Sequence, residues 1–203
     1  MTQRQGRAEA TRLKILEAAA AAFARGGLKA TSLNDLIRES GLTKGAFYFH
    51  FASKQALARA AFRLKQEQLV AGMQAAVTAD APALERLVEM LRARVRLLDQ
   101  DPSLRCVLTL GQDLRGEAEP GDQYAGFQEL ALGVFADLLA EGRADGSVRP
   151  DVEPTRDAWM AFAALIGMDA LSGLMTDGKD LEERNEDLID FLRRAVDPSR
   201  YGE

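Results

Sequence analysis

The chain has 203 residues, of which 47% are hydrophobic and 28% are charged, which is the balance of a protein that folds around an apolar core in one or two domains. A single cysteine, Cys106, excludes an internal disulfide, and with one histidine, His50, the chain lacks the usual ligands of a metal site. No run approaches the ~18 uninterrupted apolar residues of a membrane span. We therefore expect a cytoplasmic protein with no membrane contact, no cofactor and no metal.

Charge is distributed unevenly along the sequence. Residues 1–65 contain 12 Lys and Arg against 4 Asp and Glu, a net charge of +8, whereas residues 66–203 contain 14 against 27, a net charge of −13. A basic segment joined to an acidic body predicts that one end of the protein faces a polyanion. Chance clustering of charges on solvated helix faces is the alternative.

Apolar residues recur at three- and four-residue spacing nearly throughout, which predicts an all-α fold of about nine helices. A first helix carries Ile15, Ala19 and Phe23 on one face and ends at Gly26-Gly27. Hydroxyl side chains that can cap a helix start precede each of the next three helices: Thr31-Ser32, Thr43 and Ser53. The last of these helices is long and continues past Leu69.

Five further helical segments follow. Pro82 is suited to the first turn of a helix that extends through Leu98, and Asp101-Pro102 restarts the chain into a shorter apolar segment around 107–110. Residues 115–126, rich in Gly, Glu and Pro, predict a loop. The remaining helices are expected at about 127–142, 154–176 and 180–196, and the tail after Pro198 is expected to be loose.

Residues 32–51 have the form of a helix-turn-helix, in which two short capped helices are joined by a tight glycine-containing turn. The second helix opens with Thr43-Lys44-Gly45-Ala46. Its N-terminal end therefore offers free backbone N–H groups and a lysine, with only small side chains to obstruct the approach to base edges. This pattern predicts that the second helix enters the major groove of DNA.

The aromatic side chains of this second helix divide between two faces. Phe47 and Phe51 lie four positions apart and can pack inward, whereas Lys44, Tyr48 and His50 can face outward. Amine, phenol and imidazole groups suit contacts to phosphates, which position a protein on DNA without recognising its sequence. The alternative is an ordinary helical hairpin with its aromatic run in the core. The coincidence of caps, turn and basic charge favours DNA binding.

Several of these segments resemble the DNA-binding domain of TetR-family repressors: residues 10–23, 31–37, 41–51 and 53–57. The resemblance is unbroken over about residues 8–65, and residues 43–51 are most similar to the butyrolactone-autoregulator receptors of that family. Residues 140–146 and 148–152 resemble the turn between two late helices of such repressors.

The resemblance implies a homodimeric repressor that binds a near-palindromic operator in double-stranded DNA and is released by a small-molecule inducer. It divides the chain into a flexible arm (1–7), a helix-turn-helix domain (8–65) and a ligand-binding and dimerisation domain (66–198). Lys44 and Gly45 would meet base edges. Carried over position by position, the DNA-contacting residues would be Thr31, Ser32, Thr43, Lys44, Gly45, Ala46, Tyr48, His50 and Lys54.

The ligand site implied by the resemblance lies among apolar residues of the later helices, which predicts a largely apolar inducer. Ordinary core packing is the alternative for each of these residues. Butyrolactone receptors usually carry a pocket tryptophan in the stretch that corresponds to residues 124–136, where this chain has none. The candidate ligand-binding residues are Leu87, Leu91, Val107, Leu110, Phe127, Leu130, Trp159, Phe162 and Ile166.

The last two helices would form the dimer interface of such a repressor. Gly167, Ala170 and Gly173 would let another helix approach closely, and Leu188 and Leu192 supply apolar contacts from the last helix. Internal packing is the alternative for these residues. An enzyme is the first rival function, but the sole histidine lies inside the predicted DNA-contacting segment. A scaffold for an acidic protein partner is the second.

Overall fold

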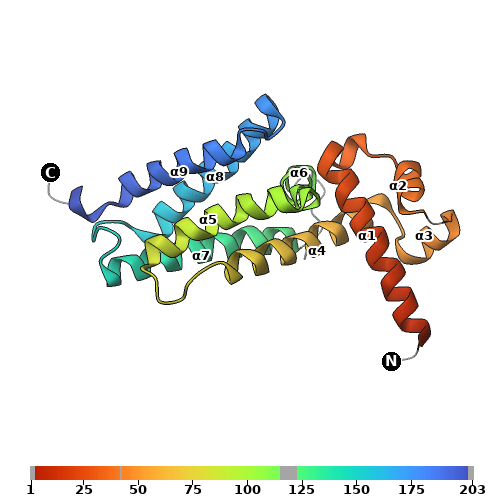
Figure 1. The fold of residues 1–203 in the computed structure, drawn as a ribbon, viewed down its shortest axis with the longest axis horizontal. Coiled ribbons are helices and arrows are strands. Elements are labelled where there is room, and N and C mark those ends of the chain that lie inside the picture. Colours follow the sequence, from red (N-terminus) through yellow and green to blue (C-terminus); the bar gives the residue numbers. More distant parts are fainter. Residues whose placement is uncertain (1–2, 42, 115–122, 201–203) are drawn as a thin grey trace. The chain divides into compact units, whose positions relative to one another are not determined.

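A computed structural model describes residues 3–41, 43–114 and 123–200, with side chains described at 6–41, 43–111, 113–114 and 128–199. Within these ranges the chain is all-α, with nine α-helices and no strand (Figure 1). The helices are α1 (Gln3–Ala30), α2 (Leu33–Ser40), α3 (Lys44–His50), α4 (Lys54–Ala75), α5 (Ala83–Gln100), α6 (Cys106–Asp113), α7 (Gln123–Asp145), α8 (Pro154–Thr176) and α9 (Leu181–Val196), with short 3-10 helices η1 (Pro102–Arg105) and η3 (Pro198–Arg200).

The chain divides into two compact units. The first combines Met1–Ala71 with Leu97–Pro120, and the second combines Gly72–Arg96 with Gly121–Glu203. The first unit is therefore larger than the helix-turn-helix segment expected from the sequence, because it includes α6. Helices α4 and α5 each contribute residues to both units.

Helix α6 belongs to the first unit because it packs on α1. The hydroxyl of Thr109 on α6 donates to the carbonyl oxygen of Phe23 at 2.9 Å, and a carboxylate oxygen of Asp113 accepts from the backbone N–H of Leu28 at 2.7 Å. A Cβ atom at Gly27 would lie 2.8 Å from Asp113 Oδ2, so a side chain there would collide with this carboxylate.

Helix α1 differs from expectation at both ends. It begins at Gln3, inside the segment predicted to be a flexible arm, since no proline stands between Gln3 and the predicted first helix and the helix accommodates Gly6. It continues past Gly26-Gly27 to Ala30, with a kink at Gly27, where φ is 66° and ψ is −174°. The predicted inward face of α1, which includes Ile15, Ala19 and Phe23, is buried as expected.

A buried lysine joins three parts of the first unit. The ammonium of Lys65 on α4 lies 2.6 Å from a carboxylate oxygen of Glu17 on α1 and 3.1 Å from one of Asp101, which precedes η1. Burial alone would lower the pKa of Lys65, but its hydrogen bonds to the two carboxylates outweigh burial and raise that pKa. Burial raises the pKa of the nearby Cys106 thiol to about 12, which makes it an unreactive core residue.

The second unit has one apolar core, formed by the inner faces of α5, α7, α8 and α9. Phe135 on α7 and Phe162 on α8 pack edge to face, with ring centroids 5.7 Å apart. The turn after α7 is tight because Gly142 lies under Val148: a Cβ at Gly142 would come within 2.5 Å of Val148 Cγ2. Asp145 then caps the start of α5 by accepting from the N–H of Ala83 at 2.8 Å.

Within the described part of the chain, α8 is the one helix long and apolar enough to cross a membrane. The sequence analysis found no uninterrupted apolar run of that length, and α8 is indeed interrupted by Asp169. One side of α8, with Ala158, Ala161 and Leu165, is buried in the core of the second unit, and Asp169 is buried in an ion pair with Arg94 of α5. These contacts are those of a helix packed in a helical domain.

Candidate nucleic-acid interface and ligand domain

Helix α2 is held at both ends by its own residues. The hydroxyl of Ser32 accepts a hydrogen bond from the N–H of Asp35 at 3.1 Å, as an N-cap does. At the other end Gly41 adopts the left-handed conformation, with φ 67°, and donates its N–H to the carbonyl of Arg38. Leu36 is buried between these ends. The left-handed turn at Gly41 ends α2 sharply, and α3 begins three residues later at Lys44.

Helix α3 is anchored by its inward aromatic residues. The hydroxyl of Thr43 accepts from the N–H of Ala46 at 3.2 Å and caps the helix. Phe47 and Phe51 are buried as the sequence predicted, with ring centroids 6.2 Å apart, and the guanidinium of Arg12 on α1 lies 5.2 Å from the centroid of the Phe51 ring. These contacts fix α3 against α1 and determine which of its side chains face outward.

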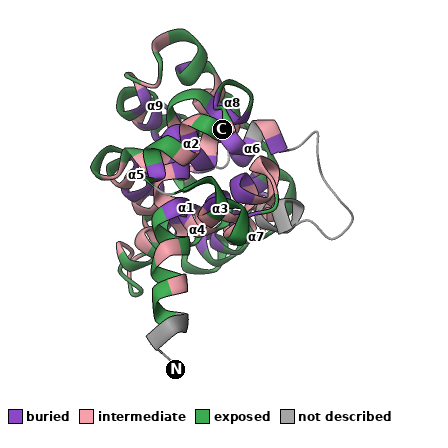
Figure 2. Ribbon diagram, turned by 90° about the vertical axis from the view of Figure 1, so that its right-hand side faces the viewer, coloured by how far each residue is buried: buried purple, intermediate pink, exposed green. Residues whose placement is uncertain are grey.

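Helix α3 combines exposed, partly buried and buried residues, and Figure 2 colours its ribbon by this burial. Lys44 and Gly45 are exposed at its start, Tyr48 is 45% exposed, and His50 is partly buried at its end. Phe49, which the sequence analysis did not select, is 81% exposed. The sequence could have indicated this exposure: Phe49 lies two positions after Phe47, which was predicted to face inward, and residues i and i+2 lie on nearly opposite sides of a helix.

Gly45 has no structural need to be a glycine. It lies within α3, and a Cβ built there would meet no atom within 4 Å outside the helix's own nearby backbone. A glycine inside a helix costs about 1 kcal/mol relative to alanine. Its bare backbone is useful where another molecule must approach closely. At Gly45 the backbone of α3 is therefore open to the close approach of a partner.

Two of the predicted DNA contacts are also used inside the protein. Thr31 is buried, and its hydroxyl donates to the carbonyl oxygen of Gly27 at 2.7 Å. The ammonium of Lys54 donates to the carbonyl oxygens of Leu28 at 2.8 Å and Thr31 at 3.1 Å. The carbonyls at the end of a helix lack partners within the helix. Thr31 and Lys54 supply partners at the junction of α1 and α2, so each side chain has a role inside the protein besides the predicted contact to DNA.

The candidate ligand-binding residues are divided between the two units. Leu87, Leu91 and Phe162 are buried in the core of the second unit, and Ile166 is packed at its edge. Val107 and Leu110 are buried on α6 in the first unit. The side chain of Phe127 lies outside the described residues.

Two other ligand candidates point away from the core. Trp159 is 60% exposed and Leu130 is 61% exposed. Trp159 follows Ala158 on α8, and it is the Ala158 side of the helix that packs in the core. Because the next residue of a helix is turned by about 100°, Trp159 faces outward. Neither side chain lines the interior of the second unit.

Helices α8 and α9 expose an apolar face. We call it the α8/α9 face, and it comprises Trp159, Met160, Gly167, Leu171, Gly173, Leu174 and Met175 of α8 with Phe191 of α9. A Cβ at Gly167 or Gly173 would meet no neighbouring atom within 4 Å. Internal packing therefore does not explain these two glycines. Leu188 and Leu192, predicted at a dimer interface, are instead buried in the chain's own core.

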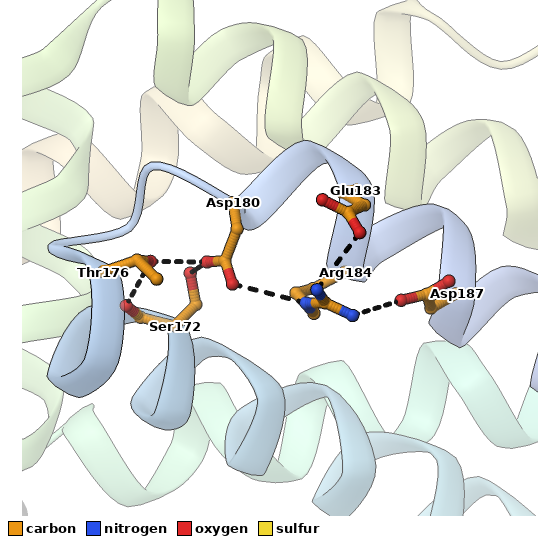
Figure 3. Close-up of polar contacts among 6 residues, drawn as sticks. All are labelled: Ser172, Thr176, Asp180, Glu183, Arg184 and Asp187. Carbon is orange, nitrogen blue, oxygen red and sulfur yellow. Dashed lines mark hydrogen bonds and ion pairs between the residues drawn. The ribbon is translucent and has the colours of Figure 1, made fainter.

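The turn between α8 and α9 is fixed by one carboxylate (Figure 3). Asp180 accepts hydrogen bonds from the hydroxyls of Ser172 at 2.5 Å and Thr176 at 2.6 Å, and it pairs with Arg184 at 3.3 Å. The two hydroxyl hydrogen bonds lower the pKa of Asp180 to about 2. Arg184 also pairs with Glu183 and Asp187, so a polar cluster holds the two helices of the exposed face together at this end.

The comparisons with known proteins agree with this arrangement. Residues 15–61 match the family model described as bacterial regulatory proteins, tetR family. TylP, a TetR regulator from Streptomyces fradiae, has a crystal structure that covers 94% of this chain and 88% of its own at 34% identity, with a TM-score of 0.67. The chain belongs to the TetR family. Its members are transcriptional regulators with an N-terminal helix-turn-helix DNA-binding domain, and they are not enzymes.

Two curated relatives of this TetR-family chain are named as a repressor and a receptor. The transcriptional repressor KstR2 of Mycobacterium tuberculosis is 29% identical over 149 residues, which are 73% of this chain and 74% of the repressor. The A-factor receptor protein of Streptomyces griseus is 30% identical over 186 residues, which are 88% of this chain and 60% of the receptor. A crystal structure named as a gamma-butyrolactone receptor is 26% identical, covers 94% of this chain and 99% of its own with a TM-score of 0.66, and agrees with the resemblance to such receptors noted for residues 43–51.

Proposed function

We propose that this TetR-family protein is a repressor that binds a near-palindromic operator as a homodimer and releases it when a small molecule binds. The observation that carries the proposal is the open start of α3. Lys44 and Gly45 are exposed there, and no contact among the residues that the structure describes requires the glycine. They lie in the basic N-terminal segment, so the surrounding charge favours a polyanion.

The proposed DNA contacts divide by chemistry. Lys44 can donate to the acceptor atoms of a guanine, and Gly45 and Ala46 leave room for a base edge to approach the backbone. Ser32, Thr43, Tyr48 and His50 carry polar groups suited to phosphates, and we propose these four as positioning contacts. All of them lie on α3 or at the N-caps of α2 and α3.

We propose the α8/α9 face as the dimer interface, with Gly167, Ala170 and Gly173 at the closest approach of the two copies. A contiguous apolar face of this kind is unusual on a monomer and is typical of an interface. The same face could instead meet lipid. The buried ion pair of Asp169 and the charged residues of α9, such as Glu183 and Asp187, favour a second copy of the chain in the cytoplasm.

We propose that the inducer binds in the second unit near Leu87, Leu91, Phe162 and Ile166. The aliphatic and aromatic side chains there favour a largely apolar molecule. The names of the A-factor receptor and of a gamma-butyrolactone receptor of known structure describe ligands of those proteins. This chain lacks a tryptophan between residues 124 and 136, so we propose the class of inducer by its apolar character alone.

Selection from a pool of random DNA duplexes tests the DNA-binding part of the proposal. The protein should enrich an inverted repeat whose half-sites are about one helical turn, or a multiple of one turn, apart. Retention in a gel shift should survive an excess of non-specific DNA. Failure to enrich any sequence would overturn the proposal and favour a scaffold for another protein.

Sedimentation of a charged variant tests the dimer. Leu174 is 84% exposed on the α8/α9 face, and Leu174→Glu should convert the dimer to a monomer because it places a charge in an apolar contact. Leu13→Glu is the matched control, because Leu13 is an exposed leucine of α1 in the other unit. A dimer that tolerates Leu174→Glu as well as Leu13→Glu would contradict the proposed interface.

A further inference from the structure

Phe49 is an exposed aromatic side chain on the helix that we propose to enter the major groove. Burial of an aromatic ring is favourable, and Phe47 of the same helix and Phe51 at its C-cap are buried. Phe49 is 81% exposed, with the partly buried His50 ring edge-on to it at a centroid distance of 5.1 Å. The isolated chain therefore gains little from a phenyl group here.

Gly45 lies one helical turn before Phe49 on α3. Residues four positions apart lie above one another on a helix, and helical side chains lean toward the N-terminus. Phe49 therefore lies one turn after Gly45 on the same side of α3, and among the described residues a Cβ at Gly45 would meet no atom within 4 Å. A base edge that approaches the bare backbone of Gly45 would come into reach of the ring.

The chemistry of a phenyl group limits what it can contact on DNA. It has no hydrogen-bond donor for a phosphate and no partner for the donor and acceptor atoms of base edges. The C5-methyl group of thymine is the apolar group that base pairs present in the major groove, and phenylalanine is one of the side chains that contact it.

We propose that Phe49 is a specificity-determining residue that contacts the C5-methyl group of a thymine in each half-site. The inference rests on the proposed function, since it requires α3 to lie in the major groove. It assigns to Phe49 a role different from that of Tyr48, whose ring packs edge to face on Phe47 at 5.9 Å and whose hydroxyl can donate to a phosphate.

Replacing thymine by uracil tests the proposal, because it removes the methyl group and leaves the base pairing unchanged. The probe is the duplex enriched by the wild-type protein from the random pool, with each thymine replaced in turn by uracil. At one thymine per half-site the replacement should weaken binding by the wild-type protein about three- to fivefold, the effect of one buried methyl group. Fluorescence anisotropy measures the affinities.

The variant Phe49→Ala should lose this sensitivity and bind the thymine and uracil duplexes equally. Phe49→Leu should keep part of it, since leucine retains an apolar contact, and Tyr48→Phe should keep all of it. Persistence of the full uracil effect in Phe49→Ala would overturn the inference. The inference would also be overturned if the wild type enriched a duplex but no replacement of thymine by uracil in it weakened binding. The proposed function would stand in that case. Enrichment of no duplex at all would overturn both.

Discussion

Arg94 and Asp169 form a two-point ion pair inside the second unit, with Arg94 Nη1 2.8 Å from Asp169 Oδ2 and Arg94 Nη2 3.0 Å from Asp169 Oδ1. Both side chains are buried, and they join α5 to α8. Burial raises the pKa of Asp169 although the guanidinium of Arg94 opposes the change. The two-point geometry fixes the register of α8 against α5, because each oxygen of the carboxylate faces its own nitrogen.

Asp169→Ala should lower the free energy of unfolding by about 3–5 kcal/mol, since it leaves the Arg94 guanidinium buried without its partner. The double variant Arg94→Met, Asp169→Leu should recover much of that loss, because neither charge is then buried. Urea unfolding at neutral pH measures both. Equal losses in the single and double variants would show that packing, and not an unpaired charge, accounts for the effect.

Gly45→Ala should separate stability from DNA binding. It should raise the stability of the first unit by up to about 1 kcal/mol, because alanine favours a helix and the added methyl meets open space. Its affinity for the enriched duplex should nevertheless fall. Gly133→Ala in α7 is the matched control: its Cβ also meets no neighbour, and it should leave DNA binding unchanged. If Gly45→Ala bound DNA as well as Gly133→Ala, close approach at this position would be refuted.

Lys54 and Lys44 should respond differently to removal of the ammonium. Lys54→Met should destabilise the first unit by about 1–3 kcal/mol, because the carbonyls of Leu28 and Thr31 lose a charged donor. Lys44→Met should change stability by less than about 0.5 kcal/mol, since Lys44 is exposed. It should instead relax the preference for one base pair by roughly 1–3 kcal/mol. Thermal unfolding and binding to single-base variants of the enriched duplex separate the two effects.

Asp180 should make the α8–α9 turn sensitive to acid. Its folded pKa of about 2 lies below the ordinary value of 3.8, so its contribution to stability is present above pH 3.8 and is lost as the pH falls toward 2. Asp180→Asn should therefore be less stable than wild type at pH 6, and the difference should narrow between pH 4 and pH 2. Urea midpoints at these pH values measure it. A constant difference across the range would exclude a role for the charge.

The helix-turn-helix could be predicted from the sequence because its signals are local. The caps at Ser32 and Thr43 and the turn at Gly41 act on residues within a few positions. The alternation of Phe47 and Tyr48 between faces follows from helix geometry. Helix α8 was predicted at its observed bounds for the same reason, since Pro154 suits the first turn of a helix and Asp177 ends the helix in the left-handed conformation.

The sequence could not reveal the side-chain environments that depend on contacts between distant parts of the chain. Thr31 and Lys54 have side chains suited to phosphates. The kink of α1 at Gly27, where Asp113 of α6 accepts from the N–H of Leu28, leaves backbone carbonyls that accept hydrogen bonds from these two side chains. Trp159 was misplaced because α8 is apolar on nearly all sides, so periodicity cannot identify its inner face. Leu188 and Leu192 form an apolar stripe that could equally face a second copy or the chain's own core.

We propose that the first unit recognises a specific DNA sequence through the exposed face of α3. The most direct measurement compares the affinities of the wild-type protein for the enriched duplex and for a scrambled duplex of the same composition at about 50 and 200 mM salt. At 200 mM salt the protein should bind the enriched duplex at least about 10³-fold more tightly than the scrambled duplex. Its affinity for each duplex should fall steeply as the salt concentration rises from 50 to 200 mM. Equal affinities for the two duplexes, or a flat response to salt, would contradict the account.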